Sequence, residues 1–302
     1  MMLTNSAVES GWGATIRGAL RLATFLTLIL VMTPIHILAR LSRHSDPFLI
    51  PCLFYKMLAR MMALQVRTHG LMAESTPTSP ILFVSNHSSY LDVPVLGSVI
   101  PAAFVAKSEV ASWPLIGTLA KLQHTVFIAR QVGRMVEQRN EMRERLEQGQ
   151  SLILFPEGTS SDGARTLPFK SSLFNIVETP LANGTFVTVQ PVTTLCTELG
   201  GLPIGRAWRP YYAWYGDMTF MRHLWNVFKL GHFTIDVIFH PTVTIREFDN
   251  RKDMASYCQH MVAKGVEQCI TGRFYVNQSA LTPATTQKLL AAPAEDLAEP
   301  NV

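Results

Sequence analysis

Charged residues are scarce in this chain of 302 residues. Asp, Glu, Lys and Arg together make up 16% of it, against about 25% in typical soluble domains. The hydrophobic content of 48% is ordinary for a folded core, and the mean hydropathy is +0.18. This composition excludes a disordered chain and indicates that part of the surface faces something apolar, most simply a membrane. The net charge of +4 is too small to indicate a nucleic-acid-binding protein.

The chain also lacks the sequence motifs of several common enzyme classes. Its four cysteines (Cys52, Cys196, Cys258 and Cys269) have no CxxC spacing, which argues against a disulfide framework and a zinc site and favours a reducing compartment. There is no GxxxxGK[ST] nucleotide loop and no HExxH zinc motif. The string nearest to a nucleophile elbow begins at Gly158 and lacks the closing glycine of GxSxG. We therefore expect no metal site.

An apolar segment lies near the start of the chain. Leu22–Ala39 contains no charged residue and would span ~27 Å as a helix, just short of a ~30 Å hydrocarbon core. Pro47–Val66 has apolar residues at helical spacing, with Lys56 and Arg60 on one face. That pattern is typical of an interfacial helix, or of a core helix with a solvated edge. We expect residues 1–70 to form a membrane-anchoring hairpin of two helices in one leaflet, with a single span as the alternative.

Beyond a polar linker at residues 72–80, short apolar runs alternate with helical patterns. The helices are expected at Gly133–Gln148 and Met254–Cys269. The strands are expected at Ile81–Ser85, Ala103–Ala106, Thr125–Ile128, Ser151–Phe155, Thr185–Pro191 and Phe233–His240. This alternation predicts an α/β domain over residues 71–276, with a mostly parallel sheet flanked by helices. Residues 277–302 have few large apolar groups and are expected to be disordered.

Two polar residues follow the strand expected at Ile81–Ser85. His87 comes two residues after its end, where α/β folds present reactive groups, and Asp92 comes five residues after His87. If the loop turns back, the carboxylate can hold one imidazole nitrogen and make the other a better base. A capping Asp near an ordinary surface His would have the same spacing.

Three other strand ends carry related chemistry. The strand at Thr125–Ile128 leads to Arg130, and the strand at Ser151–Phe155 breaks into a loop that contains Gly158. Glycine there lets backbone N–H groups approach an anion or a developing oxyanion closely. Pro191 ends a fourth strand. Each of these could be an ordinary turn or solvated strand end, but their order within one domain favours a single site.

Taken together, these blocks resemble the glycerolipid acyltransferases, typified by 1-acyl-glycerol-3-phosphate acyltransferase. The resemblance covers about residues 70–245, and order and spacing both agree. The matching positions are His87 and Asp92 in the NHx4D block, Phe127, Ile128 and Arg130 in the second block, Phe155–Thr159 in the third and Pro191 in the fourth. His124 stands where the second block usually has glycine.

This resemblance implies a His87–Asp92 dyad that acts without a covalent acyl-enzyme and needs no cofactor. The implied donor is acyl-ACP or acyl-CoA, and the implied acceptor is the hydroxyl of a lysolipid. Such an enzyme would sit in a membrane, on the cytoplasmic face of the inner membrane, and would bind membrane lipid and no nucleic acid. The expected substrate-binding residues are Asn86, Lys107, Arg130, Glu157, Gly158, Thr159, Ser160 and Arg165.

The third block also departs from the family pattern, at one position. The third block usually continues with an arginine that meets the acceptor's phosphate, and here that position is Ser160. Loss of a fork-shaped cation weakens the case for a phosphate head group. The run FPEGTSSDG, with PFKSSLF at Pro168–Phe174 and YAWYGDM at Tyr212–Met218, resembles the subgroup that acylates lyso-ornithine lipid. We rank that acceptor first and 1-acyl-sn-glycerol-3-phosphate second. A membrane-tethered lipid-binding module is the non-enzyme alternative, and it leaves the motifs unexplained.

Aromatic residues gather in one stretch of the sequence. Trp208, Tyr211, Tyr212, Trp214 and Tyr215 lie within eight positions. They suit a membrane-interface belt and an ordinary core equally well.

Overall fold

A twisted sheet forms the centre of the molecule. The computed structural model describes residues 11–41, 48–128 and 135–272. Within them the sheet has eight strands, in the order β1-β8-β6-β2-β5-β3-β4, with β7 paired to β6 off this path. The strands are β1 Leu64–His69, β2 Ile81–Ser85, β3 Ala103–Lys107, β4 Val126–Ile128, β5 Leu152–Leu154, β6 Thr188–Leu199, β7 Leu202–Pro203 and β8 Phe233–Phe239.

Most neighbouring strands run parallel, as the sequence predicts. The exceptions are the β6–β7 and β6–β8 pairs, which are antiparallel, so that β1 and β8 run against the five strands from β6 to β4. The strand expected at Thr185–Pro191 starts later and continues to Leu199. Pro191 does not end this strand. The strand continues past it because the residues from Val192 onward pair with β8.

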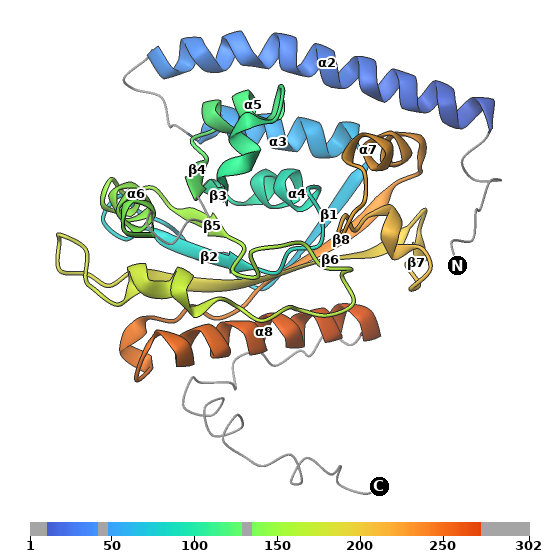
Figure 1. Cartoon of the computed structure of the whole chain (residues 1–302). Coiled ribbons are helices and arrows are strands. Elements are labelled where there is room, and N and C mark those ends of the chain that lie inside the picture. The colour runs from blue at the N-terminus through green and yellow to red at the C-terminus, as the bar shows by residue number, and fades with distance from the viewer. Residues whose placement is uncertain (1–10, 42–47, 129–134, 273–302) are drawn as a thin grey trace, which may run out of the picture.

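Helices cover both faces of the sheet (Figure 1). The α-helices are α2 Trp12–Leu41, α3 Leu49–Met61, α4 Asp92–Val99, α5 Ile116–Leu122, α6 Met135–Glu147, α7 Phe220–Lys229 and α8 Arg251–Thr271. Short 3-10 helices are η1 Ser108–Ser112, η3 Ser171–Val177, η4 Arg209–Tyr211 and η5 Ile245–Glu247. In Figure 1, α3, α4 and α7 lie on one face with α2 above them, and α8 lies on the other.

Two hydrophobic cores follow from this layering. Strand β2 is buried over its whole length, as expected for a strand covered on both faces. Its residues Ile81 and Phe83 point into the core beneath α3, α4 and α7. Leu82 and Val84 point into the core that contains side chains of α6 and α8. Because β2 is held from both sides, the loop that follows it starts from a fixed point.

Strand β1 corrects the boundary expected at residue 70. Leu64–His69 pairs with β8 in parallel, although the sequence analysis assigned these residues to the anchoring segment. Leu64 and Val66 extend the helical apolar pattern that precedes them, which concealed the strand. The helix before it, α3, ends at Met61 and buries Tyr55 against Gly97 of α4. Its opposite face exposes Leu53 and Met57.

Helix α2 lies lengthwise across α3 and α7 (Figure 1). It starts ten residues before the apolar run. Among the described helices it is the one long and apolar enough to cross a membrane, and 17% of its most apolar stretch of 18 residues is buried. Arg17 donates hydrogen bonds of 2.9 and 2.6 Å to the carbonyl oxygen of Lys229, and Arg21 donates to that of Leu230 at 2.9 Å. Near the other end, His36 Nε2 bonds to the carbonyl oxygen of Leu122 at 2.6 Å. The two arginines therefore cap the C-terminus of α7.

The helices expected near the middle and end of the domain are present as α6 and α8. Asn250 caps α8 by accepting hydrogen bonds from the backbone N–H groups of Lys252 and Asp253 at 2.8 and 3.2 Å, and Gly272 ends it with φ +67°. The tail expected to be disordered, residues 277–302, lies outside the described residues.

His124 adopts the backbone conformation of the glycine it replaces. It follows α5 with φ +60°, in the left-handed region that glycine enters without steric cost. The departure from the family pattern at this position therefore leaves the turn into β4 intact.

Candidate active site

The carboxyl ends of four parallel strands meet along one edge of the sheet. Strands β2, β5, β3 and β4 are consecutive and parallel. His87 follows β2, the loop with Gly158 follows β5, and Lys107 ends β3. Neighbouring strands lie about 4.8 Å apart, so Lys107 is on the order of 10 Å from the His87 loop. The order of the motifs along the sheet thus brings three of them together.

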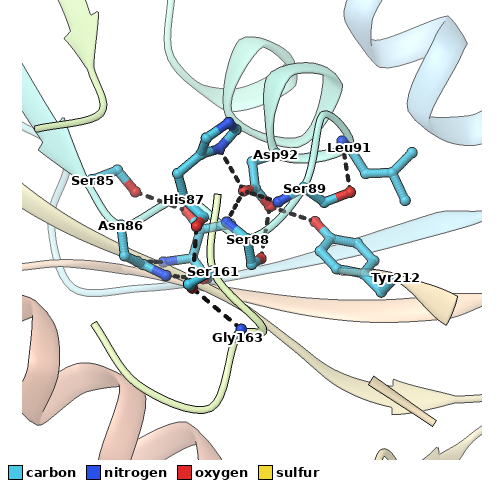
Figure 2. Close-up of polar contacts among 11 residues, drawn as sticks. Ser85, Asn86, His87, Ser88, Ser89, Leu91, Asp92, Ser161, Gly163 and Tyr212 are labelled. Atoms are coloured by element: carbon cyan, nitrogen blue, oxygen red, sulfur yellow. Dashed lines mark hydrogen bonds and ion pairs between the residues drawn. The ribbon is translucent and has the colours of Figure 1, made fainter. Parts of the chain in front are cut away.

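His87 and Asp92 form a hydrogen-bonded pair (Figure 2). His87 Nδ1 lies 3.0 Å from Asp92 Oδ2. The imidazole side chain is 21% exposed, whereas the carboxylate is completely buried. The ring nitrogen that does not face Asp92 points away from the polar cluster in Figure 2. A reactive histidine with one nitrogen held and the other accessible suits general-base chemistry.

Asp92 is held by donors from its own loop. Its Oδ2 accepts the backbone N–H groups of Ser88 at 2.7 Å and of Ser89 at 2.9 Å. The hydroxyl of Ser88 approaches Oδ1 at 3.4 Å. Asp92 is also the first residue of α4, where a negative charge is favoured by the helix dipole. These contacts fix the carboxylate before any substrate binds.

The ring and backbone of His87 are fixed by the loop after β5. Phe155 stacks on the imidazole with ring centroids 4.1 Å apart and an interplanar angle of 23°. The backbone N–H of Ser161 donates to the carbonyl oxygen of His87 at 2.9 Å, and its hydroxyl lies 3.2 Å from the same oxygen. The loop after β5 therefore holds both the ring and the backbone of His87.

Asn86 is a structural residue, contrary to the substrate-binding role expected for it. Its side-chain amide donates to the carbonyl oxygen of Thr194 at 2.8 Å and accepts the backbone N–H of the same residue at 2.9 Å. The side chain is buried. The Asn86 side chain ties the start of the loop after β2 to β6.

Glu157 also turns inward, away from the place expected for a substrate contact. It is 3% exposed, and among the described residues neither carboxyl oxygen has a hydrogen bond of good geometry. Burial raises the pKa of Glu157 to about 8; nearby backbone N–H groups of Leu167 and His87 lower it, and the charge of Asp92 raises it further. At neutral pH most Glu157 side chains are therefore protonated and uncharged.

The turn at Gly158 brings a lysine to the third block. Gly158 has φ +66°, and a Cβ placed on it would lie 2.6 Å from Lys170 Nζ. The ammonium group thus lies directly against a backbone position that only glycine leaves open. The Gly158 N–H donates to the carbonyl oxygen of Phe155 at 3.1 Å, so it is already used in the turn.

The remaining expected residues are placed as follows. Thr159 and Arg165 are exposed, and Ser160 is half-buried. Lys107 is half-buried at the end of β3. Arg130 lies outside the described residues. Within the part of the chain that the structure describes, no three His, Cys, Asp or Glu side chains are grouped in a way that could hold a metal ion.

Tyr212 is a site residue that the motif analysis missed. Its hydroxyl donates to Asp92 Oδ1 at 2.9 Å (Figure 2). Within the aromatic stretch, Tyr212 belongs to the core at 2% exposed, whereas Trp214 is half-buried against Tyr90 and Phe220. No spacing in the sequence links Tyr212 to Asp92, 120 positions away.

The chain is similar to known acyltransferases. The family model described as Acyltransferase matches residues 65–195. The chain is 36% identical over 262 residues to the lyso-ornithine lipid O-acyltransferase of Brucella abortus, covering 86% of this chain and 97% of that protein. It is 33% identical over 172 residues to the 1-acyl-sn-glycerol-3-phosphate acyltransferase of Neisseria gonorrhoeae, covering 57% and 63%.

A solved structure shares the fold. The crystal structure of the 1-acyl-sn-glycerophosphate acyltransferase from Thermotoga maritima matches with a TM-score of 0.58 at 23% identity, covering 87% of this chain and 100% of that one. This match shows a likeness of overall fold.

Proposed function

This chain belongs to the acyltransferase family, and from that premise we propose that it moves a fatty acyl group from a thioester to the hydroxyl of lyso-ornithine lipid, making ornithine lipid. The observation that carries the proposal is the pairing of a partly exposed His87 with a fully buried Asp92. The name of the Brucella abortus relative supports the choice of acceptor.

The dyad supports direct transfer without a covalent acyl-enzyme. His87 Nε2 accepts the proton of the acceptor hydroxyl as the hydroxyl oxygen attacks the thioester carbonyl carbon. Asp92 holds Nδ1 and stabilises the imidazolium that forms. When the tetrahedral intermediate collapses, the carbon–sulfur bond breaks and His87 returns the proton to the departing thiolate. This proton cycle requires no resident cofactor.

Backbone groups of the third block are suited to the oxyanion. The N–H of Gly158 is occupied by Phe155, so the role expected for Gly158 passes to its neighbours. Among the described residues, the backbone N–H groups of Thr159 and Ser160 donate no hydrogen bond. Two such donors beside a developing negative charge would lower the barrier to acyl transfer.

The charges around the third block favour a zwitterionic head group. Ser160 supplies a hydroxyl where an arginine fork would grip a phosphate. Asp162 is exposed two residues later and can attract an amine, while Lys170 and Arg165 can attract a carboxylate. An acceptor with one carboxylate and one amine needs less positive charge than a phosphate monoester.

The runner-up acceptor is 1-acyl-sn-glycerol-3-phosphate. The ammonium of Lys170 against Gly158 is the observation in its favour, because it returns a cation to the block that lost its arginine. The Neisseria gonorrhoeae relative carries that activity in its name.

We place the reaction at the cytoplasmic face of the inner membrane. The outer face of α2 exposes large apolar side chains, among them Leu30 at 76% and Leu38 at 66%. A helix with such a face binds in the interfacial region of a bilayer. The cytoplasmic side is where acyl-ACP and acyl-CoA, the two candidate donors, are available.

Transfer assays with both acceptors test the choice of head group. Purified full-length enzyme receives labelled acyl-ACP or acyl-CoA with lyso-ornithine lipid or 1-acyl-sn-glycerol-3-phosphate. We expect preferential transfer to lyso-ornithine lipid, and we expect Ser160→Arg to shift preference toward the phosphate. Ser172→Arg, at an exposed serine of η3, is the matched control and should leave the preference unchanged. Strong transfer to the phosphate alone would overturn the acceptor and leave the dyad intact.

A further inference from the structure

Within the described part of the chain, Asp92 receives one hydrogen bond from outside its own loop. The donors to Oδ2 are His87, Ser88 and Ser89, all within five residues. Oδ1 accepts the Tyr212 hydroxyl at 2.9 Å and only a long contact of 3.4 Å from the Ser88 hydroxyl. The carboxylate is completely buried, so Oδ1 has lost its hydration. The hydrogen bond from the Tyr212 hydroxyl offsets that loss.

Tyr212 is itself firmly held. Its ring packs against Phe233 of β8, with centroids 5.7 Å apart, and its backbone N–H donates to the carbonyl oxygen of Arg209 at 2.9 Å. Two residues on, the N–H of Trp214 donates to the carbonyl oxygen of Ser88 at 2.8 Å. The segment after β7 therefore clamps the catalytic loop by both a side chain and the backbone.

We propose that Tyr212 is a positioning residue of the catalytic dyad: its hydroxyl fixes Asp92 Oδ1, so that Oδ2 faces His87 Nδ1 and the other imidazole nitrogen faces the acceptor. The residue lies outside the stretch that the family model matches, residues 65–195. The proposal rests on the proposed role of the dyad in acyl transfer. It adds to that role a residue from a different part of the chain.

The hydroxyl is available as a donor throughout the working pH range. Burial, together with the neighbouring charge of Asp92, raises the pKa of Tyr212 well above its ordinary value. Besides His87, the ionisable groups on which the charge of Asp92 acts are Glu157 and Cys196, and neither donates a hydrogen bond to Asp92 among the described residues.

Tyr212→Phe tests the assignment by its effect on the pH dependence of acyl transfer. Loss of a hydrogen bond to a charged group should lower kcat about tenfold or more, with KM for the acceptor within about twofold, because no substrate contact changes. With one donor fewer, the charge of Asp92 is less compensated and stabilises the imidazolium of His87 more strongly. The ascending limb of the kcat/KM profile should therefore move to higher pH.

Thr193→Val is the matched control. The buried Thr193 hydroxyl donates to the carbonyl oxygen of Val262 at 3.0 Å, so its removal breaks a comparable buried hydrogen bond that does not involve Asp92. We expect a small loss of stability and no shift of the pH profile. Replacement of Tyr212 by 2,3-difluorotyrosine keeps the ring and strengthens the donor, and it should move the limb to lower pH. That variant decides the matter if Tyr212→Phe does not fold.

Asp92→Asn separates this inference from the function on which it rests. An inactive Asp92→Asn with a wild-type pH profile in the Tyr212 variants would overturn the positioning role alone. Wild-type turnover in a folded Asp92→Asn would overturn the dyad itself. A loss of kcat in Tyr212→Phe without any pH shift, matched by Thr193→Val, would reduce Tyr212 to an ordinary core residue.

Discussion

Glu157 is conspicuous as a carboxyl group buried within the third block. A substrate-binding carboxylate would be exposed and charged, whereas this one is 3% exposed and has its pKa raised to about 8. Its place beside the backbone of His87 indicates that the buried Glu157 side chain supports the loop after β2 by packing. A neutral side chain of the same shape should therefore serve as well.

Stability measurements on Glu157→Gln test this role. The ordinary pKa of 4.5 is raised to about 8 in the folded protein, so between these values the folded state keeps a proton that the unfolded state releases. The free energy of unfolding of the wild type then falls as pH rises through this window. Glutamine does not titrate, so the variant should gain on the order of 3 kcal/mol relative to the wild type from pH 5 to pH 8.

Urea unfolding of both proteins at several pH values measures this difference. Glu141→Gln, at an exposed position of α6, is the control and should show no pH-dependent difference from the wild type. A gap between Glu157→Gln and wild type that stays constant from pH 5 to pH 8 would mean that Glu157 is charged in the folded protein.

The chemistry of single residues was only partly predictable. His87 and Asp92 could be found because a loop that returns over five residues is local in sequence. Asn86 and Glu157 share the same motifs, yet their side chains turn into the fold, and a motif does not record the direction of a side chain. Tyr212 meets Asp92 through tertiary packing alone.

At the scale of elements, α2 combines two surfaces. Arg17, Arg21 and His36 dock it on the domain through backbone carbonyls, while its outer face remains apolar and exposed. The sequence identified the apolar run but not the docking of α2 through these polar side chains. A hydrogen bond to the end of α7 is not visible in a hydropathy pattern.

Charges on the outer face of α2 should release the protein from membranes. Leu30→Asp with Leu38→Asp replaces two side chains that are 76% and 66% exposed, each worth about 1.5–3 kcal/mol when buried in an apolar phase. We expect binding to phospholipid vesicles, measured by flotation, to fall at least tenfold. The melting temperature should change little, because neither side chain is buried in the domain.

A control pair completes this test. Leu71→Asp with Leu202→Asp changes two leucines that are 89% and 72% exposed away from α2 and should leave vesicle binding unchanged. Equal flotation of both double variants would contradict an anchoring role for α2. A deletion of residues 1–70 is unsuitable, because it removes β1 from the sheet.

The elements themselves followed from periodicity where the pattern was uninterrupted. Helix α8 and the buried strands β2 and β8 agree with their expected positions. Strand β1 did not, because its first apolar residues continue a helical pattern and its partner β8 lies far along the chain, with Arg67 opposite Asp236. Sheet partners of that separation are not specified by local sequence.

At the scale of the whole molecule, the sheet gathers what the sequence separates. Parallel strands β2, β5 and β3 end at one edge, so His87, Gly158 and Lys107 approach one another although seventy residues separate the first two. The alternation of strands and helices predicted this edge. The strand order across it, and the return of the segment with Tyr212 over the loop, depend on the packing of the complete domain.

We infer that His87 acts as the general base of acyl transfer to a lysolipid, and the turnover of His87→Ala is the measurement that tests this role. His260→Ala, on α8 across the sheet, serves as the control, and melting curves establish that both variants are folded. If His87 is the general base, kcat should fall about 10²-fold or more for His87→Ala, and His260→Ala should keep wild-type turnover. Wild-type turnover in a folded His87→Ala variant would contradict this role.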